Sequence, residues 1–154
     1  MTKAKTTSKD FGYKRIQSQL RAIKRKPFVK IGILESDGDI KRGNATLAEI
    51  ATYNEYGTRT IPERSFIRST DKENMSRWFD KIVAGQKAIY DGTSTVKKVL
   101  TDIGIDAQKK IRSKILNMST PPNAESTIKK KGFDNPLVDT GILVTKIKYK
   151  VEKA

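Results

Sequence analysis

Residues 46–70 read TLAEIATYNEYGTRTIPERSFIRST, and this segment predicts two helices joined by a rigid turn. Apolar residues at three- and four-residue spacings from Leu47 predict a short helix. Gly57 ends it, because glycine adopts a left-handed C-cap without steric cost. Pro62 fixes its own φ and disfavours helix at the residue before it, which makes the connector rigid. We therefore expect Phe66 to anchor the start of a long second helix.

A second turn-rich motif lies near the C-terminus, where residues 135–143 read NPLVDTGIL. Proline, aspartate, threonine and glycine in this arrangement predict a tight turn followed by a new element. Either motif alone is weak, since short Pro/Gly/Asp patterns mark ordinary turns in many folds. The information lies in their order and their separation along the chain.

Together the two motifs resemble the signature of the tail-completion and neck proteins of tailed bacteriophages, a family also described as head-tail joining or virion morphogenesis proteins. The first marker corresponds to a helix followed by Tyr-Gly-Thr at 56–58 and Ile-Pro-Glu-Arg-Ser-Phe-Ile-Arg at 61–68. The second corresponds to Pro-Leu-Val-Asp-Thr-Gly-Ile-Leu at 136–143. The chain departs from the family at three positions: the family often has His, Pro and Arg where this chain has Asn54, Ser65 and Ile142.

The resemblance implies a structural virion protein that forms a homo-oligomeric ring, with six copies expected, and joins the phage head to the tail. The implied partners are further copies of the chain, the head adaptor or portal, the tail tube or tail terminator, and DNA passing through the ring. The residues expected at the subunit and partner interface are Tyr56, Gly57, Arg64, Phe66, Arg68, Pro136, Leu137, Asp139, Thr140 and Gly141.

The 154 residues carry a formal net charge of +15, and the excess positive charge sits at the two ends of the chain. Residues 1–42 hold 12 Lys/Arg and 4 Asp/Glu, residues 43–108 hold 9 of each, and residues 109–154 hold 11 and 4. This distribution indicates cationic faces directed at nucleic acid or at an acidic protein surface, although solubility alone also favours charge. A protein that binds nucleic acid without sequence specificity is therefore the alternative function.

Low hydrophobicity accompanies this charge. Hydrophobic residues make up 36% of the chain and the mean hydropathy is −0.60, so part of the chain is expected to complete its packing against a partner. No apolar run is long enough to cross a bilayer and no signal peptide is evident. We expect a soluble protein that is made in the host cytoplasm and ends in the neck or tail of the virion.

Cysteine and histidine are both absent, which removes disulfides, thiolate chemistry, most zinc sites and the commonest general base. We therefore expect neither an enzyme nor a cofactor. The acidic run at 35–39 is similar to the start of a calcium loop but lacks the closing glutamate. A magnesium-dependent nuclease using Asp37 and Asp39 is the enzymatic alternative.

The N-terminal half predicts an arm, a helix, a strand and a loop. Residues 1–9 are basic and polar, which predicts a disordered arm. Apolar spacing over 10–25 predicts an amphipathic basic helix, ended by Pro27, that packs on a sheet or binds DNA. Alternation over 28–34 predicts a buried strand, and the polar residues 35–44 predict a loop.

The middle of the chain predicts either one long helix that is kinked at Gly92 or two helices that are separated there. Apolar spacing continues to Ile89, and Asp91-Gly92 interrupts it. A second run from Val96 to Ile115 follows, with Thr93 or Ser94 as its expected cap. Trp78 and Phe79, within the first run, are expected in the core.

Residues 117–141 are rich in Pro, Asn, Ser and Gly and predict a long interaction loop. A turn or two of helix is expected inside it from Asn123 to Ile128, closed by Gly132. Apolar and basic side chains then alternate over 143–152, which predicts a final strand with its lysines on one face. The expected basic contact surface, unless it is only a solvated face, comprises Lys129, Lys130, Lys131, Lys146, Lys148 and Lys150.

These elements predict an α+β fold in which a small antiparallel β-sheet packs against one or two long helices, with extended interaction loops. Residues 10–154 have the length of one domain, so the expected organisation is the basic arm at 1–9 followed by a single tail-completion-like domain.

Overall fold

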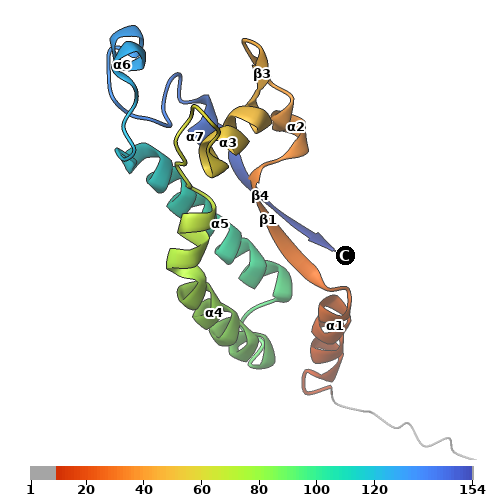
Figure 1. Cartoon of the computed structure of the whole chain (residues 1–154). Helices are drawn as coiled ribbons and strands as arrows, with labels where there is room; N and C mark the ends of the chain where they lie inside the picture. Colours follow the sequence, from red (N-terminus) through yellow and green to blue (C-terminus); the bar gives the residue numbers. More distant parts are fainter. Residues whose placement is uncertain (1–9, 154) are drawn as a thin grey trace, which may run out of the picture.

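A computed structural model describes residues 10–153 of the chain. It has the predicted α+β architecture: two long helices lie side by side, and a two-stranded antiparallel sheet packs on one of them (Figure 1). The predicted arm at 1–9 lies outside the described residues. In chain order the elements are α1 Tyr13–Lys24, β1 Pro27–Ile33, α2 Glu35–Gly38, β2 Lys41–Arg42, β3 Ala45–Thr46, α3 Leu47–Tyr56, α4 Arg68–Tyr90, α5 Val96–Asn117, α6 Glu125–Lys131, α7 Ile142–Lys146 and β4 Ile147–Lys153.

The β1–β4 sheet joins the two ends of the chain. Ile31 lies opposite Tyr149 and Ile33 lies opposite Ile147 in the antiparallel register. The apolar alternation predicted for β4 is present, since Ile147 is buried and Tyr149 is half-buried on the side toward α5. Strand β1 is less buried than predicted, because Gly32 is the one fully buried residue of this strand.

Gly104 of α5 lets the sheet approach the helix closely. A Cβ at this position would lie 2.8 Å from Cγ of Tyr149, which is shorter than any ordinary contact. We expect Gly104→Ala to lower the free energy of unfolding by about 1–2 kcal/mol, because overpacking outweighs the gain in helix propensity. Chemical denaturation measures this difference. Gly38→Ala is the matched control, since its Cβ would lie 3.5 Å from that of Ala48, and a loss as large as at Gly104 would contradict the account.

The main apolar core lies at one end of the molecule, where α3, α7 and the C-terminal half of α5 meet (Figure 1). Phe66, Ile115 and Ile147 have no exposed surface, which confirms Phe66 as the anchor before α4. Trp78 and Phe79 do not belong to this core, so that prediction is wrong. Trp78 is half-buried and donates its indole N–H to Asp106, and Phe79 is exposed.

The ends of several elements also differ from the predictions. Thr95, rather than Thr93 or Ser94, caps α5, because its hydroxyl accepts the N–H of Lys98 at 3.2 Å. Ala124, rather than Asn123, precedes α6, and Gly132 closes that helix as predicted.

Two segments are more regular than predicted. The polar loop at 35–44 contains the short helix α2 and strand β2, which pairs with β3 in a hairpin. Residues 143–146 belong to α7 and not to the final strand, since Gly141 at φ 76° starts a helical turn before β4 begins. The predicted strand face therefore loses Lys146, which ends α7.

Candidate interaction site

Glu55, near the end of α3, holds the start of α4 in place. Its carboxylate accepts backbone N–H groups of Phe66 at 2.8 Å, Ile67 at 2.9 Å and Arg68 at 2.8 Å, and the hydroxyl of Ser65 at 2.8 Å. The first N–H groups of a helix have no partner within the helix, and a negative charge stabilises that end. One buried carboxylate thus supplies the acceptors for the turn before α4.

The protonation state of Glu55 follows from these contacts. Burial alone would raise its pKa, but the N–H groups of Ile67 and Arg68 and the Ser65 hydroxyl stabilise the carboxylate. Together they leave the pKa of Glu55 below its ordinary value. The side chain is therefore ionised at neutral pH although it is buried.

Arg64 ties the turn between α3 and α4 to the start of the 117–141 segment. Its Nε donates to the carbonyl oxygen of Pro121 at 2.8 Å, and its Nη2 donates to that of Pro122 at 2.7 Å. Nη1 lies 3.5 Å from Oδ1 of Asn54. The guanidinium is buried, and this burial lowers the pKa of Arg64 from its ordinary value. The planar fork of the guanidinium suits two adjacent carbonyl groups.

Tyr56 and Arg68 form the accessible part of this turn. The Arg68 guanidinium lies 4.3 Å from the centroid of the Tyr56 ring, a cation–π contact, and its Nη2 lies 2.8 Å from Oε1 of Glu63. Gly57 ends α3 with φ 72°, as predicted, but its ψ of 170° is extended and not left-handed helical. A Cβ at position 57 would lie only 2.9 Å from the backbone N of Glu63, so the close approach of the chain also requires a glycine there.

The second motif forms a turn between α6 and α7. The side chain of Asn135 accepts the N–H groups of Leu137 and Val138 at 3.2 and 3.1 Å. Leu137 enters the core, while Asp139 points outward and accepts a hydrogen bond from Arg42 at 3.2 Å. Gly141 ends the turn and begins α7.

The two motifs meet in space although about 80 residues separate them. A cavity of about 120 Å³ lies between Leu47, Ile50 and Asn54 of α3 and residues 136–143, with Arg42 at its edge. We use the name junction site for this cavity together with the exposed Tyr56–Arg68 contact, which borders a separate hollow on another side of α3. Phe66 of the first motif and Leu137 of the second belong to the same apolar core.

Three predicted interface residues lie inside the subunit. Arg64, Phe66 and Leu137 are each at most 6% exposed, so the expectation that these side chains contact a partner is wrong, and they hold the fold instead. Tyr56, Arg68, Asp139 and Thr140 keep exposed side chains. Gly57, Pro136 and Gly141 set the path of the backbone.

The predicted lysine row of β4 is largely paired with carboxylates. Lys146 and Lys148 place their Nζ atoms 2.7 and 2.6 Å from the oxygens of Asp37, which is nearly buried. These two ammonium groups hold the pKa of Asp37 below its ordinary value. Because Asp37 holds both ammonium groups and compensates one of their two charges, these two lysines do not form the free basic row that the alternation predicted.

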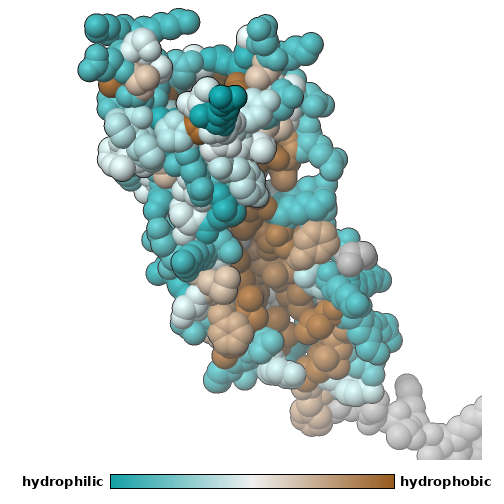
Figure 2. Space-filling view, in the orientation of Figure 1, coloured by the Kyte–Doolittle hydropathy of each residue, from teal (hydrophilic) through white to brown (hydrophobic). Residues whose placement is uncertain are grey.

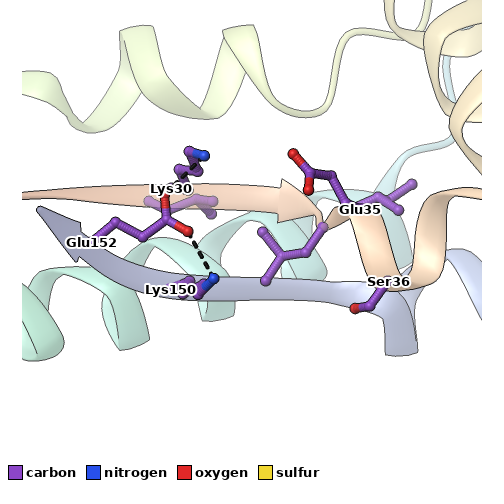
Figure 3. A pocket seen from close by; sticks show the side chains of 8 residues that line it. Lys30, Glu35, Ser36, Lys150 and Glu152 are labelled. Atoms are coloured by element: carbon purple, nitrogen blue, oxygen red, sulfur yellow. Dashed lines mark ion pairs between the residues drawn. The ribbon is translucent and has the colours of Figure 1, made fainter. Parts of the chain in front are cut away.

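The third lysine of the row belongs to a hollow on the outer face of the sheet. Lys150 and Lys30 lie 2.8 Å from the two carboxylate oxygens of Glu152, and Figure 3 shows the pair made by Lys150. Both lysines lower the pKa of Glu152, to about 2. The hollow has a volume of about 720 Å³ and also contains Glu35. Its charges mostly compensate one another.

The basic run at 129–131 lies on α6. Lys129 and Lys130 are exposed. Lys131 donates to the carbonyl oxygen of Asn135 at 2.7 Å and lies 4.9 Å from the centroid of the Phe133 ring. Lys129 and Lys130 are therefore the accessible charges of this run, at the end of the molecule far from α1 (Figure 1).

The described part of the chain contains no group of three or more Asp, Glu, His or Cys side chains arranged to hold a metal ion. Asp37, one of the two residues named for a nuclease, instead contacts two ammonium groups. Within residues 10–153 no helix is long and apolar enough to cross a membrane.

Comparisons with known proteins add no relative. No family model matches the sequence, and no curated protein or solved structure matches it.

Sequence reasoning missed three residues that build the site: Glu55, Asp37 and Arg42. Asp37 was considered only as a metal ligand. The partners of Asp37 and Arg42 lie 97 or more residues away along the chain, so no local pattern reveals these contacts. For Glu55 a signal exists. It is an acidic residue two positions before the helix-ending Gly57, and it lies 12 residues before Ile67, the N-cap of α4, which has no capping side chain.

Proposed function

We propose that the chain is a structural subunit of the neck of a tailed bacteriophage, a tail-completion protein that assembles into a ring and joins head to tail. The observation that carries the proposal is the convergence of the two family-like motifs at the junction site. The motif residues with buried side chains fix this site, and Tyr56, Arg68 and Asp139 present its outer surface. Such a role requires no catalytic group.

The large accessible surface of the chain supports assembly. It measures 11107 Å², whereas a compact monomer of 17.3 kDa exposes about 7,800 Å². The ten residues outside 10–153 can expose at most about 1,600 Å² in any conformation. At least about 1,700 Å² of excess surface therefore belongs to the described residues. A standard interface covers about 800 Å² of each partner, so two neighbours, as in a ring, would account for the excess.

Head-tail joining tests the proposal. We expect Tyr56→Ser to reduce joining of isolated heads and tails at least tenfold, because Tyr56 is the exposed aromatic residue of the junction site. Tyr53→Ser is the matched control, since Tyr53 lies one turn earlier on α3, is also exposed, and should leave joining within about twofold. Joining that is independent of the protein would contradict the proposal.

One observation favours nucleic-acid binding as a second candidate function. Lys14, Arg21 and Arg25 lie along one face of α1 around a shallow hollow, and none forms an ion pair with another residue in the 10–153 range. Such a face suits a phosphate backbone, and binding would weaken steeply with salt. Absence of binding to random duplex DNA near 50 mM salt would exclude this function.

A further inference from the structure

Apolar side chains gather on one face of the molecule, over the region between the α4–α5 pair and the α1–β1 segment (Figure 2). The residues with the most apolar surface there are between 39% and 64% exposed. We call this surface the α1–α4 face, and its residues are Leu20 and Ile23 of α1 and Phe79, Ile82 and Val83 of α4.

Helix α4 exposes this apolar surface because it packs on α5 with a different side. Gly85 lies against Val99 of α5, and Trp78 donates to Asp106 of α5. Phe79 and Val83 are four residues apart and lie on a side of the helix that α5 does not cover. Helix α4 therefore has two packing sides: α5 covers one, and α1 approaches the other only near its C-terminal end, at Gln86, Ile89 and Tyr90.

Helix α1 is attached weakly to the remainder of the chain. It contains no fully buried residue. Gln19 accepts the N–H of Val96 at 3.0 Å, and Arg15 donates to the carbonyl oxygen of Tyr90 at 3.3 Å. Between α1 and α4 lies a mostly apolar hollow of about 130 Å³. An amphipathic helix normally obtains its position by burying its apolar side, which α1 does only in part.

We infer that a second copy of the chain covers the α1–α4 face, with α1 of one copy packed on α4 of the other. The inference rests on the self-association proposed above and names the surface that carries it. The unused surface is large enough, since the excess of at least about 1,700 Å² exceeds the roughly 800 Å² that one standard interface covers on each partner.

The charges beside the face also favour a second copy. Lys24 lies one turn from Leu20 on α1, and Asp80 lies about one turn from Val83 on α4. Neither forms an ion pair with any residue whose position the structure gives. The two helices thus offer opposite charges beside uncharged apolar surfaces. Packing α1 against α4 of another copy therefore brings complementary partners together.

Sedimentation velocity of the full chain tests this inference. We expect Leu20→Asp and Val83→Asp each to weaken self-association at least about 100-fold, because each buries a carboxylate without a partner. Leu116→Asp is the matched control, since Leu116 is about as exposed as Leu20 but lies at the other end of the molecule, and it should stay within about threefold. Circular dichroism must show unchanged helix content in all three variants.

Crosslinking provides a second measurement that does not depend on weakening the assembly. The chain has no cysteine, so an equimolar mixture of Leu20→Cys and Val83→Cys chains can be joined by a short bis-maleimide only where α1 of one copy lies near α4 of another. We expect this mixed product, and expect none with Leu116→Cys in place of Val83→Cys.

The outcomes separate the inference from the proposed function. An assembly that persists in both Asp variants, without the mixed crosslink, overturns the inference and leaves the ring possible. A dimer that shows the crosslink but never grows supports the inference and contradicts the ring. Raising the salt concentration should change the contact little, since it screens both the repulsion between chains of charge +15 and the attraction between Lys24 and Asp80. A contact that weakens steeply with salt would overturn it.

Discussion

Glu55→Gln is expected to lower the free energy of unfolding by about 3 kcal/mol, the largest loss among the polar substitutions proposed here. The carboxylate accepts three backbone N–H groups at the start of α4, and glutamine replaces one of its oxygens by a donor that faces them. At least one buried N–H group is then left without an acceptor, and the negative charge at the helix start is lost. Urea denaturation of the variant and the wild type measures the difference.

The matched control for Glu55 is Glu63→Gln. Glu63 lies in the same turn and pairs with Arg68 at 2.8 Å, but it is more than half exposed. Its substitution should cost less than about 1 kcal/mol. Equal losses at the two positions would show that Glu55 does not organise the turn.

The ionisation of Glu55 also makes the stability depend on pH. Its pKa in the folded chain lies below the ordinary value of 4.5, so the folded state binds the proton less readily than the unfolded state. The stabilisation is present above pH 4.5 and is lost as the pH falls through the folded pKa. Wild-type stability should therefore fall more steeply below pH 4.5 than that of Glu55→Gln, and parallel curves would contradict the assignment.

Arg64→Met should lower the free energy of unfolding by about 2–3 kcal/mol and should loosen one specific segment. Methionine fills most of the same space but cannot donate to the carbonyl oxygens of Pro121 and Pro122. Hydrogen exchange should therefore become faster in residues 117–135, while the centre of α5 remains protected.

Arg59→Met is the control for Arg64. Arg59 lies in the same connection between α3 and α4 but is exposed, and its substitution should change stability by less than about 0.5 kcal/mol. Uniformly faster exchange over the whole chain in Arg64→Met would indicate global destabilisation instead of release of the segment.

The sequence predicted best where a backbone requirement is local. Gly57 and Pro62 determine the backbone of the turn through their own conformational preferences, independently of tertiary contacts. Phe66, four residues after Pro62, was therefore correctly predicted as the buried anchor before α4. The α+β class also followed from local spacing. The strand prediction for residues 143–146 was wrong. Apolar and basic side chains alternate from these residues into β4, and this alternation does not reveal the helical turn that Gly141 starts.

Tertiary contacts account for the remaining errors. The alternating lysines at the C-terminus predict a free basic surface. Lys146 and Lys148 instead pair with Asp37, which lies about 110 residues earlier in the chain, so the local pattern cannot show this contact. Phe79 has the spacing of a core residue, and its place on the side of α4 that α5 leaves uncovered depends on the Gly85–Val99 contact. Apolar spacing shows that a helix has a packing side but does not show whether the same chain covers it.

Native mass spectrometry of the wild-type chain at micromolar concentration tests the central claim most directly. We expect one dominant closed assembly with a fixed number of copies of the 17.3 kDa chain. A 17.3 kDa monomer at every concentration, with isolated phage heads and tails present as well as absent, would contradict it.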